Sequence, residues 1–282
     1  MPHDYKQDLV AIKEWMSKES HIPEDIGLED HLLMRFLHSC YFSLEATKRC
    51  IDKFCVTRAH MSEVYNARDP LLPNIKQMLD HSFVGTYPFD GKEMIIFKYD
   101  DPATENFNFY DFLKIISIHN DVWVKHYPHF ADEHYIIIDM SWISLKMIPK
   151  INIQYLKDFI VYLLESMPVR VKKVVGINAP SYYEKIYGLI KSILPAEVIE
   201  IIHIYTNVES LHQFVDKKYL PIEYGGEAIS LVEFDRGQRQ QIVDFRKFYL
   251  NDNAWKADLL KKPKQKNVDN SMNGSFRTLA ID

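Results

Sequence analysis

Tyr135-Ile136-Ile137-Ile138 is a short, uniformly apolar run that decides the fold of the larger part of this 282-residue chain. Similar runs occur at residues 94–97, 174–177 and 201–205. Between them, apolar residues recur at helical spacing over residues 108–126, 150–166 and 180–194. Short strands without polar alternation are typical of a parallel sheet whose faces are covered by helices. The alternation of the two kinds of element therefore predicts an α/β layer architecture.

The first part of the chain shows an all-helical pattern instead. Apolar residues recur at helical spacing over residues 4–19 and 29–39, and Ser43 is a good N-cap for a third helix. Two X-Pro pairs between residues 69 and 73 then break the pattern. We therefore divide the chain into a helical N-terminal module at 1–78, a sheet domain at 79–250 and a C-terminal tail at 251–282.

Composition excludes several classes of function. Hydrophobic residues make up 47% of the chain and the net charge is −5, so the sequence predicts a sizeable core and no nucleic-acid binding. The first residues lack the apolar segment of a secretory signal, and no apolar run approaches the ~18 residues of a membrane span. The cysteines Cys40, Cys50 and Cys55 are odd in number and lie close together, which indicates reduced thiols in a cytoplasmic protein.

Motifs for catalysis, metal binding or cofactor binding are missing from the sequence. It contains no G-x-S-x-G elbow, no phosphate-binding G-x-x-x-x-G-K-[ST] loop and no G-x-G-x-x-G fingerprint. His126, His129 and His134 lie close together, but their spacing around Tyr127 and Pro128 does not match a metal site. We interpret them as surface loop histidines, and we expect no enzyme activity, no metal and no cofactor.

The helices between the strands are apolar on more than one side. In the helix at 108–126 one stripe contains Phe109, Phe112 and Leu113, and a second contains Ile115 and Ile118. Such a helix is buried on several sides. Two interpretations remain open at this point: ordinary packing in the core, or walls of a cavity for a mostly apolar ligand.

Several segments follow one another in a characteristic order along the chain. They read Asp30-His31-Leu32-Leu33-Met34-Arg35-Phe36-Leu37, Ile137-Ile138-Asp139-Met140, Glu165-Ser166-Met167-Pro168-Val169-Arg170-Val171-Lys172, Gly176-Ile177-Asn178-Ala179-Pro180, Ile202-His203-Ile204 and Leu220-Pro221-Ile222-Glu223-Tyr224-Gly225-Gly226. In these segments the chain resembles the CRAL-TRIO lipid-binding family, closest to its α-tocopherol transfer protein and retinaldehyde-binding protein branch. The closing Gly274-Ser275-Phe276-Arg277 is similar to the ends of arthropod members.

This resemblance implies both a fold and a function. The implied fold is an N-terminal helical bundle followed by a mixed or parallel sheet, with flanking helices that enclose an apolar pocket. The implied function is an intracellular carrier that binds one hydrophobic ligand, such as a tocopherol, retinoid, carotenoid or related terpenoid lipid. The helix at 181–194 would be a mobile gate that releases the ligand at a transient membrane contact. The alternative is a ligand-regulated protein-interaction module with the same fold.

The resemblance also assigns positions to the pocket, and it matches part of a basic site for lipid headgroups. The implied pocket residues are Leu113, Ile116, Ser117, Asn120, Ile136, Ile138, Phe159, Tyr162, Leu163, Met167, Val174, Tyr183, Ile186, Tyr187 and Ile190. Arg170, Lys172 and Lys173 match the first half of the headgroup site, but its second half is the acidic and apolar segment 197–201. A site that binds a phosphoinositide headgroup needs several cations that converge on it, so the sequence disfavours ligand release controlled by a phosphoinositide.

Overall fold

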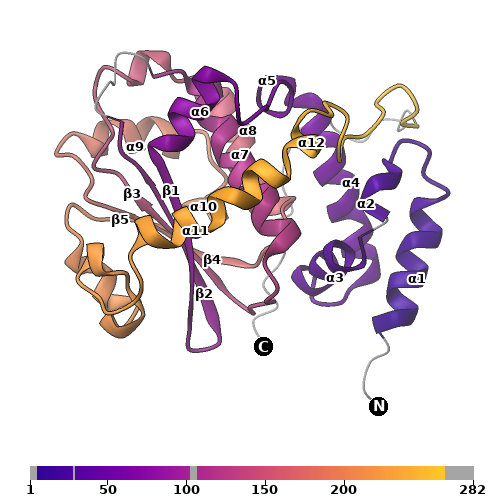
Figure 1. Cartoon of the computed structure of the whole chain (residues 1–282), viewed down its shortest axis with the longest axis horizontal. Helices are drawn as coiled ribbons and strands as arrows, with labels where there is room; N and C mark the ends of the chain where they lie inside the picture. The colour runs from indigo at the N-terminus through magenta and orange to yellow at the C-terminus, as the bar shows by residue number, and fades with distance from the viewer. Residues whose placement is uncertain (1–4, 28, 102–106, 264–282) are drawn as a thin grey trace.

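A single five-stranded sheet in the order β1-β2-β3-β4-β5 forms the centre of the fold (Figure 1). The computed structural model describes residues 5–27, 29–101 and 107–263. The strands are β1 (Ser82–Phe89), β2 (Lys92–Tyr99), β3 (His134–Asp139), β4 (Val171–Ile177) and β5 (Ile202–Ile204). Strands β2 to β5 are parallel, which confirms the α/β prediction, and β1 adds an antiparallel pair with β2.

Strand β1 was not among the strands expected from the sequence. Its residues include Gly85 and Pro88, which are typical of an edge strand and weaken the strand pattern. A two-residue turn at Asp90 and Gly91 connects it to β2, and both residues have positive φ, at 44° and 76°. Asp-Gly is a favoured pair for this hairpin geometry because glycine adopts positive φ without steric cost.

The N-terminal module is helical, as predicted, and lies beside the sheet domain. Its helices are α1 (Tyr5–Met16), α2 (Glu24–Gly27), α3 (Asp30–Ser39), α4 (Leu44–His60) and α5 (Ser62–Tyr65), and α6 (Pro73–Asp80) leads into the first strand. The Ser43 side chain accepts a hydrogen bond from the backbone N–H of Ala46, which confirms the predicted N-cap of α4.

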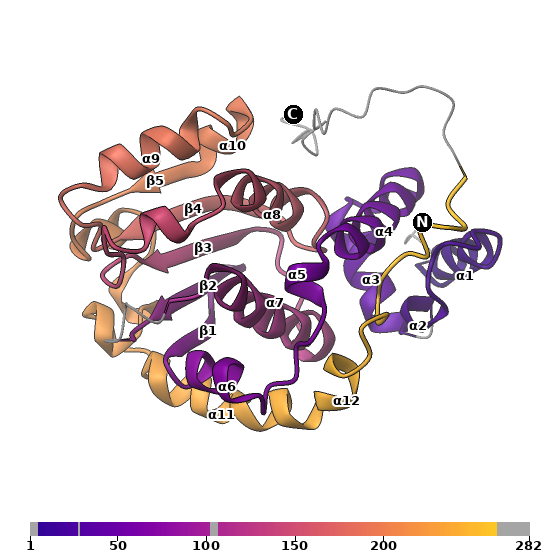
Figure 2. The same ribbon diagram turned by 90° about the horizontal axis from the view of Figure 1, so that it is seen from above.

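Helices cover one face of the sheet and short turns cover the other. Figure 2 shows α7 (Phe109–His126) and α8 (Ile153–Glu165) on the side that faces the N-terminal module. On the opposite side, the 3-10 turns at Glu209–Gln213, Lys217–Tyr219 and Ile222–Tyr224 pack against strand residues such as Ile137 and Val175. Helices α9 (Tyr183–Lys191) and α10 (Ala196–Ile201) lie at the β5 edge (Figure 2).

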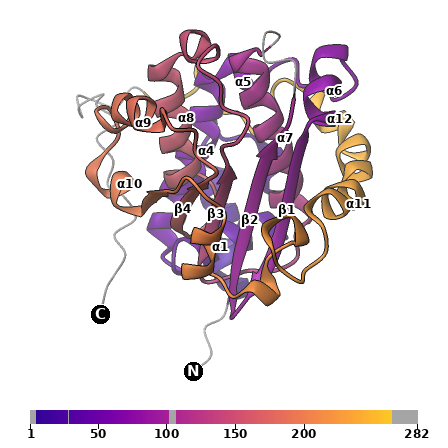
Figure 3. The same ribbon diagram turned by 90° about the vertical axis from the view of Figure 1, so that its left-hand side faces the viewer.

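Helix α11 (Leu231–Asp244) lies along the other edge of the sheet, next to β1 (Figure 3). Asp235 Oδ1 accepts a hydrogen bond from the backbone N–H of Val84 at 3.1 Å, and Arg239 Nη2 donates to the carbonyl oxygen of Ser82 at 2.7 Å. The side chains of α11 therefore bind backbone groups of the edge strand directly.

The chain after α12 (Arg246–Tyr249) returns to the N-terminal module. Trp255 is 2% exposed, and its ring lies 6.0 Å from that of Phe54 on α4. The backbone N–H of Ala257 donates to the carbonyl oxygen of Cys55. Trp255 and Ala257 are thus packed on the module, whereas Gly274-Ser275-Phe276-Arg277 lies outside the described residues.

A buried ion cluster joins the N-terminal module to the sheet domain. Arg58 on α4 and Arg68 after α5 both donate to the carboxylate of Asp121 on α7, and all three side chains are at most 1% exposed. Burial alone would raise the pKa of Asp121, but the charges of Arg58 and Arg68 hold it below its usual value. The charged carboxylate therefore links α7 to the module.

Candidate functional site

The helix-covered face of the sheet is less completely buried than its opposite face. Ile95, Ile136 and Val174 lie opposite one another on β2, β3 and β4, and each is partly exposed. Phe97 and Ile138 form the next pair along the same face and are partly exposed as well. On the opposite face, the central positions are fully buried at 0% exposure; they are Met94, Ile96, Ile137, Val175 and Ile177. Interior packing normally buries central strands on both faces, so the partial exposure marks this face as a candidate binding surface.

Helix α7 runs along this face from the ends of the strands to their starts. The Phe112 ring lies 5.7 Å from that of Phe97, while Trp123 lies 5.6 Å from His134 at the start of β3. Ile116 and Asn120 lie between these contacts, one helical turn apart, and both are partly exposed. Leu113 is 1% exposed and belongs to the core. The structure thus brings Ile116 and Asn120 to the same side of the domain as Ile136 and Ile138.

Ser117 and Tyr162, two polar residues assigned to the pocket, face the buried arginines. Ser117 Oγ accepts a hydrogen bond from Arg68 at 3.3 Å and donates to the carbonyl oxygen of Lys114 at 2.8 Å. The Tyr162 hydroxyl accepts a hydrogen bond from Arg58 at 3.1 Å, and burial raises the pKa of Tyr162 to about 12. Both hydroxyl groups therefore serve the junction between the module and the domain.

The remaining assigned residues of α8 and the loop behind it differ in burial. Phe159 and Met167 are 1% and 3% exposed and belong to the core cluster shared with the N-terminal module. Leu163 is partly exposed and packs against the same cluster. Leu163 is thus partly exposed and packed against this cluster, as Ile116 is, whereas Phe159 and Met167 are core residues.

Helix α9 follows the end of β4, where the gate was expected. Tyr183, Tyr187 and Ile190 are partly exposed, and the side chain of Ile186 lies outside the described residues. The Tyr182 hydroxyl, one residue before the helix, donates a hydrogen bond to the carbonyl oxygen of Ile143 at 2.6 Å. This bond connects the start of α9 to the loop that follows β3.

Arg170 and Lys173, two of the three cations assigned to a headgroup site, point in different directions. Arg170 Nη1 donates to Asp132 at 2.5 Å and Nε donates to the carbonyl oxygen of His38 at 3.0 Å, and the side chain is only 8% exposed. Lys173 lies over the ring of Phe214 on the face opposite Val174. Lys172 lies between the β4 residues that pair with His134 and Tyr135, at an irregularity in the register of β3 and β4. The guanidinium of Arg170 is therefore engaged in contacts with the N-terminal module.

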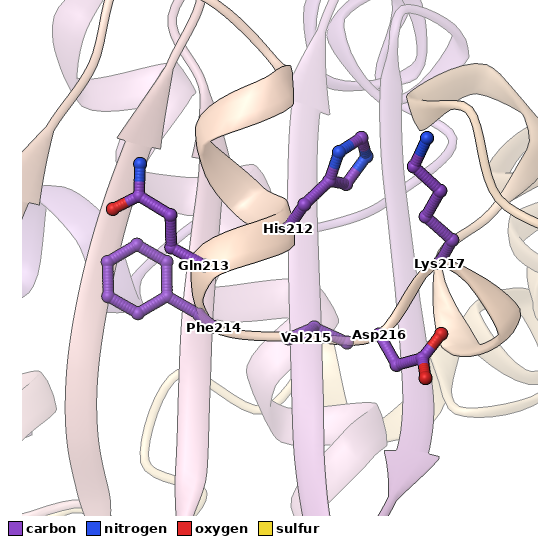
Figure 4. A pocket seen from close by; sticks show the side chains of 6 residues that line it. All are labelled: His212, Gln213, Phe214, Val215, Asp216 and Lys217. Atoms are coloured by element: carbon purple, nitrogen blue, oxygen red, sulfur yellow. The ribbon is translucent and has the colours of Figure 1, made fainter.

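A hollow of about 430 Å³ lies on the opposite side of the sheet from α7 (Figure 4). It is lined by residues 212–217, and Figure 4 shows the His212 and Lys217 side chains next to each other. Gln213, Asp216 and Lys217 are exposed to solvent. This hollow has a polar surface and contains none of the residues assigned to the pocket.

His134 lies in β3 and His126 is the last residue of α7, so the interpretation as surface loop residues is wrong for these two of the three histidines. His134 is the first residue of β3 and only 2% exposed, whereas His126 and His129 are exposed. The run Tyr135 to Ile138 already predicted a strand, and His134 extends it by one residue. Within the described ranges, no group of three His, Cys, Asp or Glu side chains is arranged to hold a metal ion.

The Leu220 to Gly226 segment holds other elements in place. Glu223 accepts hydrogen bonds from Ser230 and from the backbone N–H groups of Leu231 and Val232, at the start of α11. The hydroxyl of Tyr224 donates to Asp139 at the end of β3 at 3.3 Å. The segment thus holds the start of α11 and the end of β3 in place, so its hydrogen bonds stabilise the fold.

The helices of the described residues include none that is long and apolar enough to cross a membrane. This statement covers residues 5–27, 29–101 and 107–263.

Two family models match this chain. Residues 1–75 match the family described as a Pinta-like UBA domain, and residues 83–226 match the CRAL/TRIO domain. Clavesin-1 of Rattus norvegicus is 28% identical over 221 residues, which cover 76% of this chain and 61% of Clavesin-1. Clavesin-2 of Mus musculus is 23% identical over 279 residues, which cover 96% of this chain and 82% of Clavesin-2. The crystal structure of Sfh5 aligns with a TM-score of 0.49 at 12% identity, over 86% of this chain and 100% of that chain.

The match to the CRAL/TRIO domain spans more than half of the 282 residues. It contains the sheet, apart from Ser82 at the start of β1, together with α7, α8 and α9. The chain spans about three-fifths of the length of Clavesin-1. The chain belongs to the CRAL/TRIO domain family.

Proposed function

We propose that this protein is a non-enzymatic carrier of one hydrophobic lipid, which binds between the sheet, α7 and α8. Tocopherols, retinoids, carotenoids and related terpenoids are the candidate ligands that family membership suggests. The observation that carries the proposal is the partial exposure of Ile95, Ile136, Ile138 and Val174 beneath covering helices. Partial exposure of central strand residues under helices implies room beside them for further apolar atoms.

The free energy of burial makes such binding reasonable. A terpenoid that buries ~400 Å² of apolar surface gains roughly 10 kcal/mol at ~25 cal/mol/Å². Loss of ligand freedom and ordering of side chains remove several kcal/mol of this gain. The remainder is sufficient to keep a water-insoluble molecule on the protein.

Release would take place at a membrane, with α9 as the gate. The loop after β3 contains Leu145, whose side chain is 55% exposed, next to the exposed Lys146. Ile143 in the same loop binds Tyr182 at the start of α9. An exposed leucine beside a lysine suits the boundary between lipid tails and anionic headgroups. Contact of this loop with a membrane would therefore act directly on the gate.

Further parts of the proposal concern the headgroup site, the location and the domains. Arg170 is occupied by Asp132 and His38, so we assign it no phosphoinositide. Cys40, Cys50 and Cys55 are buried and not joined in disulfides, which suits the cytoplasm. The boundaries at residues 78 and 250 remain part of the proposal, and the ion cluster around Asp121 would make both parts unfold together.

A cavity-filling substitution tests the carrier function. Purified protein and its Ile138→Trp variant are each loaded with a panel of terpenoid lipids, extracted with organic solvent and analysed by mass spectrometry. We expect a stoichiometric ligand in the unmodified protein and at least a tenfold weaker affinity in the variant. Leu250→Trp is the matched control, because Leu250 is 54% exposed outside the site. Absence of any bound lipid in the unmodified protein would contradict the carrier and favour a protein-interaction module.

A further inference from the structure

The first residue pair on the helix-covered face is polar, unlike the pairs that follow it. Glu93 and His134 lie opposite each other at the start of β2 and β3, and both are 2% exposed. Their atoms Oε2 and Nε2 are 3.4 Å apart, without the alignment of a hydrogen bond. The apolar pair Ile95 and Ile136 follows two residues further on, about 7 Å along the strands. The apolar face therefore ends at a buried carboxylate and an imidazole.

The hydrogen bond at Nδ1 of His134 shows which ring nitrogen carries the proton. Nδ1 accepts a hydrogen bond from the backbone N–H of Arg170 at 3.3 Å. In a neutral imidazole the other nitrogen then carries the proton, so Nε2–H is a donor. This donor points toward the same small region as the Glu93 carboxylate.

A second donor comes from α7. Trp123 is 8% exposed, and its ring meets that of His134 edge-on at 5.6 Å. Among the residues that the structure describes, Nε1 of Trp123, Nε2 of His134 and Oε2 of Glu93 are all buried without a hydrogen-bond partner. Buried polar atoms are nearly always paired in native proteins, so three unpaired atoms on neighbouring side chains point to a partner that is not part of the protein.

A buried cation lies next to the cluster. The guanidinium of Arg35 on α3 lies 4.4 Å from the centre of the Trp123 ring. Burial lowers the pKa of Arg35 to about 10, and the negative charge of Glu93 acts in the opposite direction. The Arg35 cation thus lies close enough to the Glu93 carboxylate to compensate part of its charge.

We propose that this cluster binds the polar end of the lipid, and that the lipid has a single terminal hydroxyl group. The inference rests on the carrier function proposed above. A hydroxyl group donates one hydrogen bond and accepts two, which matches one acceptor on Glu93 and two donors on Trp123 and His134. A pure hydrocarbon leaves all three atoms unpaired, and a fatty acid brings a second carboxylate next to Glu93.

The cluster also gives the ligand a direction. It lies at the starts of the parallel strands, and α9 follows the end of β4. A ligand with its hydroxyl at Glu93 therefore extends its tail past Ile136 and Ile138 toward the gate. Asn120 is one helical turn from Trp123 on α7 and would lie beside the first carbons of the chain.

A matched series of probes tests this inference. Phytanol, phytane and phytanic acid share one branched chain and differ only in the terminal group. Each is partitioned between vesicles and the full-length protein and quantified by mass spectrometry. We expect phytanol to bind at least tenfold more tightly than the other two.

Two identical substitutions at opposite ends of the face provide the variant and its control. Trp123→Phe removes one donor and keeps the ring, so we expect a five- to tenfold loss of affinity for phytanol and none for phytane. Trp142 lies at the other end, with its ring 5.3 Å from that of Tyr99, and its Nε1 is also buried and unpaired within the described residues. Trp142→Phe should leave the ratio of phytanol to phytane affinity unchanged.

Glu93→Gln is an independent variant in case a tryptophan substitution disturbs folding. It keeps an acceptor oxygen and removes the charge, so we expect binding of phytanic acid to improve at least threefold. Equal binding of all three probes by the unmodified protein, or equal effects of both tryptophan substitutions, would overturn the inference and leave the carrier function intact. Failure to bind any of the probes and any lipid of the terpenoid panel would overturn both.

Discussion

Asp121 on α7 accepts hydrogen bonds from Nη1 and Nη2 of Arg58 on α4, each at 2.8 Å, in a region where neither side chain is more than 1% exposed. Asp121→Asn removes the charge and leaves Arg58 and Arg68 buried without a counterion. Removal of one partner from a buried pair costs about 3–5 kcal/mol. We expect a loss of this order in the free energy of unfolding, measured by urea denaturation followed by circular dichroism.

Asp258→Asn is the control for that prediction. Asp258 pairs with Lys261 at an exposed site, and such pairs contribute about 0–1 kcal/mol. Similar losses for the two variants would contradict the assigned role of the buried cluster.

Acid should weaken the contact between α3 and the loop after α7. His38 on α3 lies 3.4 Å from Asp132, and Arg170 and His134 are its other charged or titratable neighbours. Burial, assisted by the charge of Arg170, lowers the pKa of His38 to about 4. Burial and the charge of Arg35 also lower the pKa of His31, whose Nε2 bonds to the carbonyl oxygen of Tyr127 at 3.0 Å.

The sign of the pH effect follows from these lowered values. An unfolded histidine has a pKa near ~6.5, so the unfolded state takes up protons first as the pH falls. The histidine contribution to stability is therefore complete above about pH 6.5 and is lost toward about pH 4. Urea midpoints at pH 7, 5.5 and 4.5 measure this loss. The double variant His31→Gln, His38→Gln should show a smaller fall, and an equal fall would contradict the prediction.

Substitution by alanine at two different glycines should change the free energy of unfolding in opposite directions. A Cβ atom at Gly226 would lie 2.0 Å from the carbonyl oxygen of Leu220, so Gly226→Ala must displace backbone. We expect a loss of about 2–3 kcal/mol or more in the free energy of unfolding. Gly237 lies inside α11, and a Cβ there meets no atom within 4 Å. Gly237→Ala should therefore gain about 0.5–1 kcal/mol, because alanine favours a helix interior. Thermal denaturation of both variants distinguishes these outcomes.

Tyr182→Phe should speed the release of a bound lipid, provided that α9 is the gate. The substitution removes the hydrogen bond to Ile143 that joins α9 to the loop after β3. A neutral hydrogen bond contributes about 1 kcal/mol, so we expect roughly a fivefold faster transfer to acceptor vesicles in a stopped-flow assay. Tyr219→Phe removes a hydrogen bond to Asp90 at the far hairpin and serves as control. Equal transfer rates in the two variants would argue against α9 as the gate.

Sequence patterns located the parallel strands because short, uniformly apolar runs are typical of strands that are buried on both faces. They missed β1, whose Gly85 and Pro88 obscure the pattern and whose position depends on the Asp90-Gly91 turn. Within α7, helical spacing could not show that Ser117 faces Arg68, because Arg68 comes from another segment about fifty positions earlier in the chain. The sequence also could not predict that Glu93 lies opposite His134, since this placement depends on the register between β2 and β3.

The arrangement of α11 has a consequence for how the protein behaves at high concentration. An open edge strand offers unpaired N–H and C=O groups to any neighbouring chain and so invites intermolecular sheet growth. Because Asp235 and Arg239 bind the backbone of Val84 and Ser82, two backbone groups at the start of this edge are already paired within the protein. Helix α11 therefore also hinders a strand of another molecule from adding to the β1 edge.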